Sequence, residues 1–131
     1  MILDYLQILA SDGAFKTEKQ VVDSNITALK GISNEFSIPV IAISSLNRES
    51  YMRNSGLAAF KESGGIEYGA DVIFSLKFQM ESKNQEDMNR ELKKMPREIA
   101  LEVLKNRNGT SRQSVNFNYY CKYHFFESVL N

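Results

Sequence analysis

Strand-like apolar runs and one helical stripe alternate along the first third of the chain. An apolar run at residues 1–3 ends at Asp4, and a second run spans Val40–Ile43. Between them, Thr17 and Gln20 have the spacing of a capping box, which predicts the start of a helix. That helix carries an apolar stripe at spacings of three and four: Val22, Ile26, Leu29, Ile32 and Phe36. The pattern predicts a β-α-β unit with a right-handed crossover, whose second strand is parallel to the first and buried on both faces.

The middle of the chain is typical of strands separated by polar segments. A short helical patch is expected to be broken at Gly64 and Gly65, before a third strand at residues 71–76. The segment Lys77–Arg97 is strongly charged and predicts a solvated insertion. One exposed helix near residues 84–94 is the alternative.

The last third predicts antiparallel strands. Alternating apolar residues indicate strands at 98–103 and 115–119, with a tight turn at Asn108-Gly109 between them. An aromatic strand over residues 123–126 is expected to follow. Parallel strands followed by an antiparallel edge hairpin indicate an α/β fold, similar to the C-terminal half of a RecA-like P-loop NTPase domain. Residues 1–131 are therefore expected to form one partial domain of this kind.

Composition narrows the possible chemistry. Sixteen basic residues balance sixteen acidic ones, so bulk charge does not indicate a nucleic-acid partner. The lone Cys121 excludes an intramolecular disulfide and fits a reducing, cytoplasmic compartment. His124 is the only histidine, which argues against His-based metal or triad chemistry and favours a half-buried structural role. The longest apolar stretch, Ile38–Ile43, has the length of a strand, so no membrane partner is expected.

Asp4 is the first candidate for catalysis. An apolar strand that ends in an acid has the form of a Walker B element, in which the carboxylate serves a Mg²⁺-bound nucleotide at the carboxyl edge of a parallel sheet. The sequence contains no G-x-x-x-x-G-K-[ST] phosphate loop. We therefore expect the second half of an ATPase module, beginning at or just before this strand. A capping or turn role for Asp4 is the alternative.

Three further clusters bear on function. Ser45, Asn47 and Arg48 follow the second strand, where polar groups face the nucleotide edge and can sense the γ-phosphate; a helix-capping loop is the alternative. The segment 60–71 exposes glycine N–H groups near Lys61 that suit the phosphates of single-stranded DNA, unless it is only a glycine-broken helix. The third cluster, at the predicted hairpin tip, holds the two cations Lys105 and Arg107.

These two cations point the same way if the strand continues through them. An exposed arginine beside a lysine is what a trans-acting arginine finger requires, because it must reach a neighbouring subunit's phosphates. A solvated turn is the alternative.

In this order, the clusters resemble the C-terminal ATPase domain of DnaB-family replicative DNA helicases. The matching stretches are I-L-D-Y-L-Q, I-P-V-I-A-I-S-S-L-N-R, F-K-E-S-G-G-I-E-Y-G-A-D-V-I-F and L-K-N-R-N-G. The resemblance implies that Asp4 holds Mg²⁺ through water, and that Lys105 and Arg107 act on the adjoining subunit's ATP. It places Lys61, Glu62 and Gly64 in a loop that tracks DNA.

For the parent protein, the resemblance implies Mg²⁺ and ATP as cofactors and a hexameric ring that translocates 5′-to-3′ on single-stranded DNA. Primase and a helicase loader are the further partners it implies, with a bacterial or phage origin.

Two residues depart from the family pattern. Ser45 stands where the family usually has Gln, and its hydroxyl is too short to span the same distance, which puts γ-phosphate sensing there in doubt. Lys61 stands where Arg is common, so bidentate phosphate geometry is lost. Because the phosphate loop and the family's upstream catalytic glutamate are also lacking, the isolated chain is expected to be inactive. A different RecA-like ATPase, such as a recombinase or clock-type ATPase, and a non-enzymatic remnant that regulates helicase subunits are the alternatives.

Overall fold

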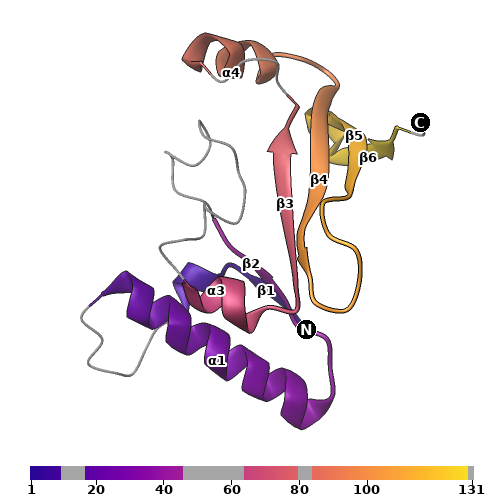
Figure 1. Ribbon diagram of the computed structural model, residues 1–131. Helices are drawn as coiled ribbons and strands as arrows, with labels where there is room; N and C mark the ends of the chain where they lie inside the picture. Colours follow the sequence, from indigo (N-terminus) through magenta and orange to yellow (C-terminus); the bar gives the residue numbers. More distant parts are fainter. Residues whose placement is uncertain (10–16, 46–63, 80–83, 130–131) are drawn as a thin grey trace. The chain divides into compact units, whose positions relative to one another are not determined.

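The computed structural model describes residues 1–9, 17–45, 64–79 and 84–129, which fall into two compact units (Figure 1). The described part of the first unit ends at Asp71, and that of the second begins at Val72. Each unit has its own β-sheet, a parallel pair in the first and a four-stranded antiparallel sheet in the second. Among the helices in these ranges, none has the length and apolarity that a bilayer span requires.

The first unit contains the predicted β-α-β arrangement. Strand β1 (Ile2–Asp4) leads through a 3₁₀ turn, η1 (Leu6–Ile8), toward helix α1 (Glu18–Phe36), and β2 (Ile41–Ile43) follows. The two strands pair in parallel, with Ile2 opposite Ile41 and Asp4 opposite Ile43. The predicted parallel pairing is therefore confirmed.

The predicted burial of the second strand is wrong. Ile41 is 60% exposed and Ile43 46% exposed, as expected for a two-stranded sheet that lacks a covering layer on that face within the described residues. Apolar residues on both faces make a strand suitable for burial. Whether it is buried depends on the neighbouring elements that pack on it.

Helix α1 begins where the capping pair predicts. The Thr17 hydroxyl oxygen accepts a hydrogen bond from the backbone N–H of Gln20 at 3.3 Å, which satisfies one of the free donors of the first turn. Within the apolar stripe, Val22 and Leu29 are buried. Asn25, buried between them, donates its side-chain N–H to the Leu9 carbonyl at 3.3 Å. This bond ties the helix to the segment that follows η1.

The helical patch that was expected to end at Gly64 and Gly65 lies outside the described residues. The two glycines themselves are the first residues of helix α3 (Gly64–Gly69). The Gly65 N–H donates to the Asp23 carboxylate on α1 at 3.0 Å. A Cβ at Gly65 would lie 2.1 Å from Asp23 Oδ1 and 3.0 Å from its Cα, and one at Gly69 would lie 2.3 Å from Cγ2 of Ile26. Glycine therefore allows α3 to lie directly against α1, a tertiary requirement that local helix propensity does not reveal.

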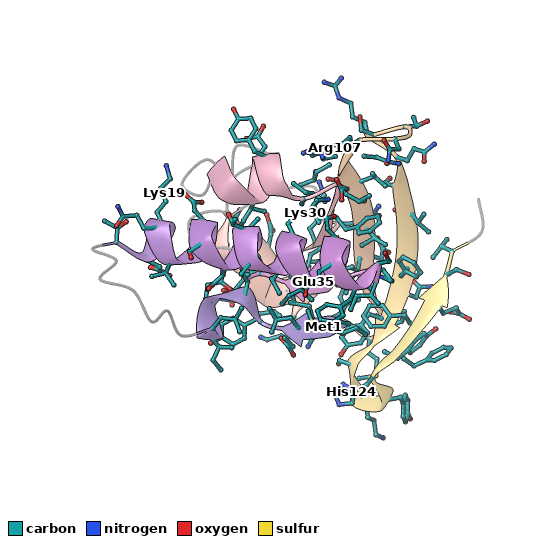
Figure 2. The ribbon with its side chains drawn as sticks, turned by 90° about the horizontal axis from the view of Figure 1, so that it is seen from below. Met1, Lys19, Lys30, Glu35, Arg107 and His124 are labelled. Atoms are coloured by element: carbon teal, nitrogen blue, oxygen red, sulfur yellow. The ribbon has the colours of Figure 1, made fainter. Side chains whose placement is uncertain are left out.

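An ion pair joins the same two segments. Lys30, on the side of α1 that faces α3, pairs with Asp71 just beyond the end of α3 (Figure 2). Both side chains are partly exposed, so the pair adds little stability by itself. Its contribution is to hold the end of the α3 segment beside the middle of α1.

The second unit is an antiparallel sheet in the order β3 (Val72–Phe78), β4 (Arg97–Asn106), β5 (Ser114–Tyr120) and β6 (Phe125–Ser128). The predicted strands are present, but the antiparallel part is larger than the edge hairpin expected, because β3 pairs antiparallel with β4. On β3, buried Ile73 and Ser75 alternate with exposed Phe74 and Leu76. One face of this strand is therefore covered and the other open.

Part of the predicted insertion 77–97 lies in strands and a helix. Its first residue, Lys77, lies in β3 and forms an ion pair of 2.6 Å with Glu102 on β4. The alternative of a helix is confirmed as α4 (Gln85–Glu91). Asn84 caps its start, because the Asn84 side-chain oxygen accepts from the Asp87 N–H at 2.8 Å. Within the described residues, charged side chains of this segment lie in β3, in β4 and in the first and last turns of α4.

Two turns of this unit differ from expectation. The β4–β5 connection runs from residue 107 to 113, and Arg112 rather than Gly109 adopts a positive φ, of 64°. The prediction of a tight turn at Asn108-Gly109 is therefore wrong.

At the other end of β5, the predicted aromatic strand begins only at Phe125. His124, just before it, has a left-handed conformation with φ 50° and is exposed, and it follows a 3₁₀ turn, η3 (Cys121–Tyr123). His124 is not half-buried.

We predict that Gly65→Ala destabilises the protein by about 1–3 kcal/mol, since the new methyl group collides with the side chain and Cα of Asp23. Gly31→Ala is the matched control, because a Cβ there meets nothing within 4 Å and alanine favours a helix interior by roughly 1 kcal/mol. Chemical denaturation followed by circular dichroism measures both changes. Equal stability changes in the two variants would contradict the close packing of α3 on α1.

Candidate functional site

Asp4 and Ser45 converge at one edge of the first unit. Asp4 is the last residue of β1 and lies opposite Ile43, the last residue of β2, so the chain leaves both strands at the same edge. Ser44 and Ser45 follow β2 immediately, and Asp4 and Ser45 are exposed. This is the carboxyl edge of a parallel pair, the place where α/β folds bind nucleotides.

Gln7 connects the two strand ends. Its side-chain N–H group donates to the Ser44 hydroxyl at 2.9 Å and to the Ser45 carbonyl at 3.3 Å, while its oxygen accepts from the Ser45 N–H at 3.5 Å. Leu6, only 1% exposed, anchors the 3₁₀ turn that carries Gln7. One amide thus holds the backbone of the segment after β2 at a fixed distance from the strand that ends in Asp4.

Sequence reasoning gave no role to Gln7. The signal that points to it is its position three residues after Asp4. One 3₁₀ turn then returns the side chain toward the strand end, because such turns have three residues per repeat. A polar residue at this spacing after a strand-terminal acid is therefore a candidate for the same site as the acid.

The other candidates for sensing and DNA binding are only partly covered by the structure. Asn47, Arg48, Lys61 and Glu62 lie outside the described residues. Gly64 is the first residue of α3.

Lys105 and Arg107 lie at the end of β4 in the second unit. Ile73 pairs with Lys105 but Phe74 pairs with Val103, so Leu104 is an extra residue in a β-bulge. The strand ends at Asn106, and Arg107 is exposed in the turn beyond it (Figure 2). Lys105 and Arg107 were expected to point the same way only if the strand continued through both. Because β4 ends at Asn106, this condition is not met.

Hydrogen bonds within the hairpin close the loop that carries Arg107. The Asn106 side-chain N–H donates to the Thr110 carbonyl at 3.4 Å, and a Cβ at Gly109 would lie 2.6 Å from that same nitrogen. Arg112 N–H donates to the Val103 carbonyl and Val103 N–H to the Gln113 carbonyl, both at 2.8 Å. These bonds give the loop a defined base from which Arg107 projects.

The donors at the carboxyl edge fit Mg²⁺ held in the manner of a nucleotide site. No group of three acidic, His or Cys side chains gathers anywhere in the described ranges, so a dedicated protein cage for a metal is not found there. Mg²⁺ keeps several waters and needs only one or two carboxylates when phosphates complete its shell. A single exposed carboxylate at this edge, Asp4, suits that arrangement.

Comparison with known proteins identifies the family. The model of the DnaB-like helicase C terminal domain matches residues 1–128. The chain belongs to this family. The chain is 37% identical over 115 residues to the replicative DNA helicase DnaB of Leifsonia xyli subsp. xyli (strain CTCB07), covering 86% of this chain and 24% of that protein. It is 31% identical over 113 residues to the Geobacillus stearothermophilus replicative DNA helicase DnaB, covering 83% and 23%.

Solved structures agree on the fold. One solved ATPase domain matches with a TM-score of 0.78 at 24% identity, over 98% of this chain and 44% of that one. A DnaB-like replicative helicase, from a structure describing its interactions with primase, matches with a TM-score of 0.76 at 25% identity, over 95% and 29%. The predicted α/β, RecA-like class is thereby confirmed. The chain spans about a quarter of the length of the Leifsonia xyli and Geobacillus stearothermophilus relatives.

We predict that Gln7→Ala loosens the segment after β2. Loss of the bonds to Ser44 and Ser45 should cost about 1 kcal/mol and speed amide hydrogen exchange at Ser45. Gln79→Ala is the matched control, since Gln79 donates instead to Asn116 in the second unit and should leave Ser45 exchange unchanged. Equal rates of amide hydrogen exchange at Ser45 in the wild type and in Gln7→Ala would show that Gln7 does not bridge the two segments.

Proposed function

We propose that this chain is the Walker B-to-hairpin part of an ATP-dependent replicative DNA helicase, which moves 5′-to-3′ along single-stranded DNA as a hexameric ring. The observation that carries the proposal is the carboxyl edge at which Asp4 and the segment after β2 are joined by Gln7. Membership of the DnaB-like family supports the same assignment.

In this proposal Asp4 holds Mg²⁺ through water. Asp4 would hold the ion, which would supply positive charge against the negative charge that develops during phosphoryl transfer. The exposed Asp4 carboxylate supplies the anion, and the parallel pairing holds it at the nucleotide edge. Gln7 keeps Ser44 and Ser45 beside that edge. Ser45 is proposed as a sensing residue, together with Asn47 and Arg48, which follow it in sequence.

Lys105 and Arg107 are proposed to act in trans on a neighbouring subunit's ATP. Arg107 is exposed, and the hydrogen bonds at the base of its loop limit how far the hairpin can move. A guanidinium on a loop held in this way can neutralise charge on the neighbouring subunit's phosphate with little rearrangement of the loop. Lys105, which is half-buried next to the bulge, would be the secondary cation.

The proposed partners follow from the same assignment. Lys61, Glu62 and Gly64 would contact the backbone of single-stranded DNA, and ATP with Mg²⁺ would be the cofactors. Primase is proposed as a partner because the DnaB-like helicase of similar structure was described with primase. A helicase loader and a cytoplasmic location complete the proposal.

We predict that the isolated 131-residue chain binds Mg-ATP weakly or not at all. The phosphate loop normally provides most of the grip on the nucleotide, whereas Asp4 and the hairpin cations supply only metal and trans contacts. Isothermal titration calorimetry with Mg-ATP measures this directly, and Asp4→Asn serves as the control for any residual heat. Micromolar affinity of the isolated chain would contradict the division of roles.

We predict that Arg107→Ala lowers ATP turnover by about 10³-fold or more in an assembled ring. The test is a chimera in which residues 1–128 replace the matching segment of the Geobacillus stearothermophilus relative. Nucleotide binding and assembly should be nearly unchanged, because the finger acts mainly on the transition state. Lys105→Ala should be less severe, since an ammonium lacks the planar fork.

Mixed rings provide the control for action in trans. Inactive Arg107→Ala subunits mixed with inactive Asp4→Ala subunits should regain part of the activity, because some interfaces then pair an intact Asp4 with a neighbour's intact Arg107. Rings that stay inactive at every mixing ratio, despite proven co-assembly, would show that Arg107 does not act in trans.

A further inference from the structure

An open hollow of about 490 Å³ lies at the turn between β5 and β6 in the second unit. Its lining residues are Tyr120, Tyr123, Phe125 and Glu127. Tyr120 ends β5 and pairs with Phe125, the first residue of β6, and Tyr123 belongs to the 3₁₀ turn between them. The four lining residues therefore come from one hairpin, β5 and β6 with the turn between them; Figure 1 shows the two strands side by side.

Two of the three aromatic rings of this hollow are largely exposed, and Tyr120 is half-buried. Tyr123 is 66% and Phe125 54% exposed, although each ring would gain free energy from burial. The Tyr120 and Phe125 rings have centroids 6.1 Å apart and are inclined by 38°, so they are tilted toward each other rather than stacked face to face. An exposed aromatic cluster of this kind is typical of a binding surface.

The hollow also carries negative charge. Glu127 Oε2 accepts a hydrogen bond from the Tyr120 hydroxyl at 3.1 Å. That bond, to a carboxylate, raises the pKa of Tyr120, so the phenol remains a neutral donor at physiological pH. A carboxylate has about four acceptor positions, and Tyr120 uses one of them. Aromatic faces and a carboxylate both attract cations.

A cation of the chain itself already contacts one of these rings. Lys122 Nζ lies 5.4 Å from the centroid of the Tyr123 ring, within the range of a cation–π contact. The ring is therefore placed where a positive group can approach it. Lys122 also competes with any external cation, which supplies a way to test the assignment.

We propose that the Tyr120–Glu127 hollow binds an arginine side chain presented by a partner protein. A guanidinium is planar, so it stacks on an aromatic face while its N–H groups reach a carboxylate. Lysine satisfies only the charge and cannot stack in this way. A nucleic-acid base would also stack, but its phosphates would be repelled by Glu127.

Binding of N-acetyl-arginine methylamide to the ¹⁵N-labelled chain, followed by amide chemical shifts, tests the proposal. The arginine probe should shift residues 120–127, and its neutral isostere, N-acetyl-citrulline methylamide, should bind about tenfold more weakly or not at all. This pair of probes needs no mutation. Equal shifts from both probes would overturn the proposal.

Matched variants separate charge from stacking. Glu127→Gln and Phe125→Leu should each weaken the arginine probe about tenfold. Glu35→Gln on α1 and Phe126→Leu, whose ring stacks on Tyr119 with centroids 4.4 Å apart, should leave it unchanged. Unchanged affinity in Glu127→Gln would exclude the carboxylate and with it the proposal.

Lys122→Met distinguishes a cationic ligand from a nucleic acid. Removing the competing ammonium should tighten binding of the arginine probe about two- to fivefold, whereas it would weaken binding of a thymidine oligonucleotide. Weaker binding of the arginine probe, or oligonucleotide binding at residues 120–127 that exceeds it, would overturn the proposal in favour of a base-stacking surface.

Discussion

The parallel pairing of β1 with β2 is the constraint on which the candidate nucleotide edge depends. The Met1 amino group donates to the Pro39 carbonyl at 2.7 Å and the Ile41 N–H to the Met1 carbonyl at 2.9 Å, which sets the register at the start of both strands. Because both strands then run in the same direction, Asp4 lies beside Ile43. A slip of one residue would turn Asp4 to the opposite face of the sheet. Gln7 can bridge to the segment after β2 only in this register.

Local sequence predicted the elements better than it predicted their surroundings. The capping pair at Thr17 and the stripe of α1 are local patterns. The cap is found, and the stripe is buried at Val22 and Leu29, but Phe36 at its end is 62% exposed. The exposure of Ile41 and the placement of Gly65 in a helix depend on contacts with other segments, or on the lack of them. In sequence, a glycine that leaves room for a neighbouring side chain such as Asp23 cannot be distinguished from a glycine that breaks a helix. Only the position of α1 distinguishes the two.

The candidate site divides in the same way. The convergence of Asp4 and Ser45 follows from the rule that parallel strands end at one edge. The bridge from Gln7 did not follow, because it depends on a 3₁₀ turn that the apolar pattern does not indicate. The bulge at Leu104 could not be predicted from the sequence either. It changes the direction in which the side chains leading to Arg107 point. Rules based on alternating strand positions fail wherever one extra residue enters a strand.

The second unit presents chemically opposite surfaces at the two ends of β5. The hairpin with Arg107 precedes this strand, and the aromatic hollow with Glu127 follows it. Seven residues of extended chain separate them by roughly 20 Å. That distance is about twice the screening length at physiological salt, so the charge of Glu127 hardly affects a phosphate near Arg107. An arginine bound in the hollow would therefore leave the electrostatics of the hairpin unchanged. Any coupling between the two ends would have to pass through the hydrogen-bonded sheet, as a change in the position of β5 relative to β4.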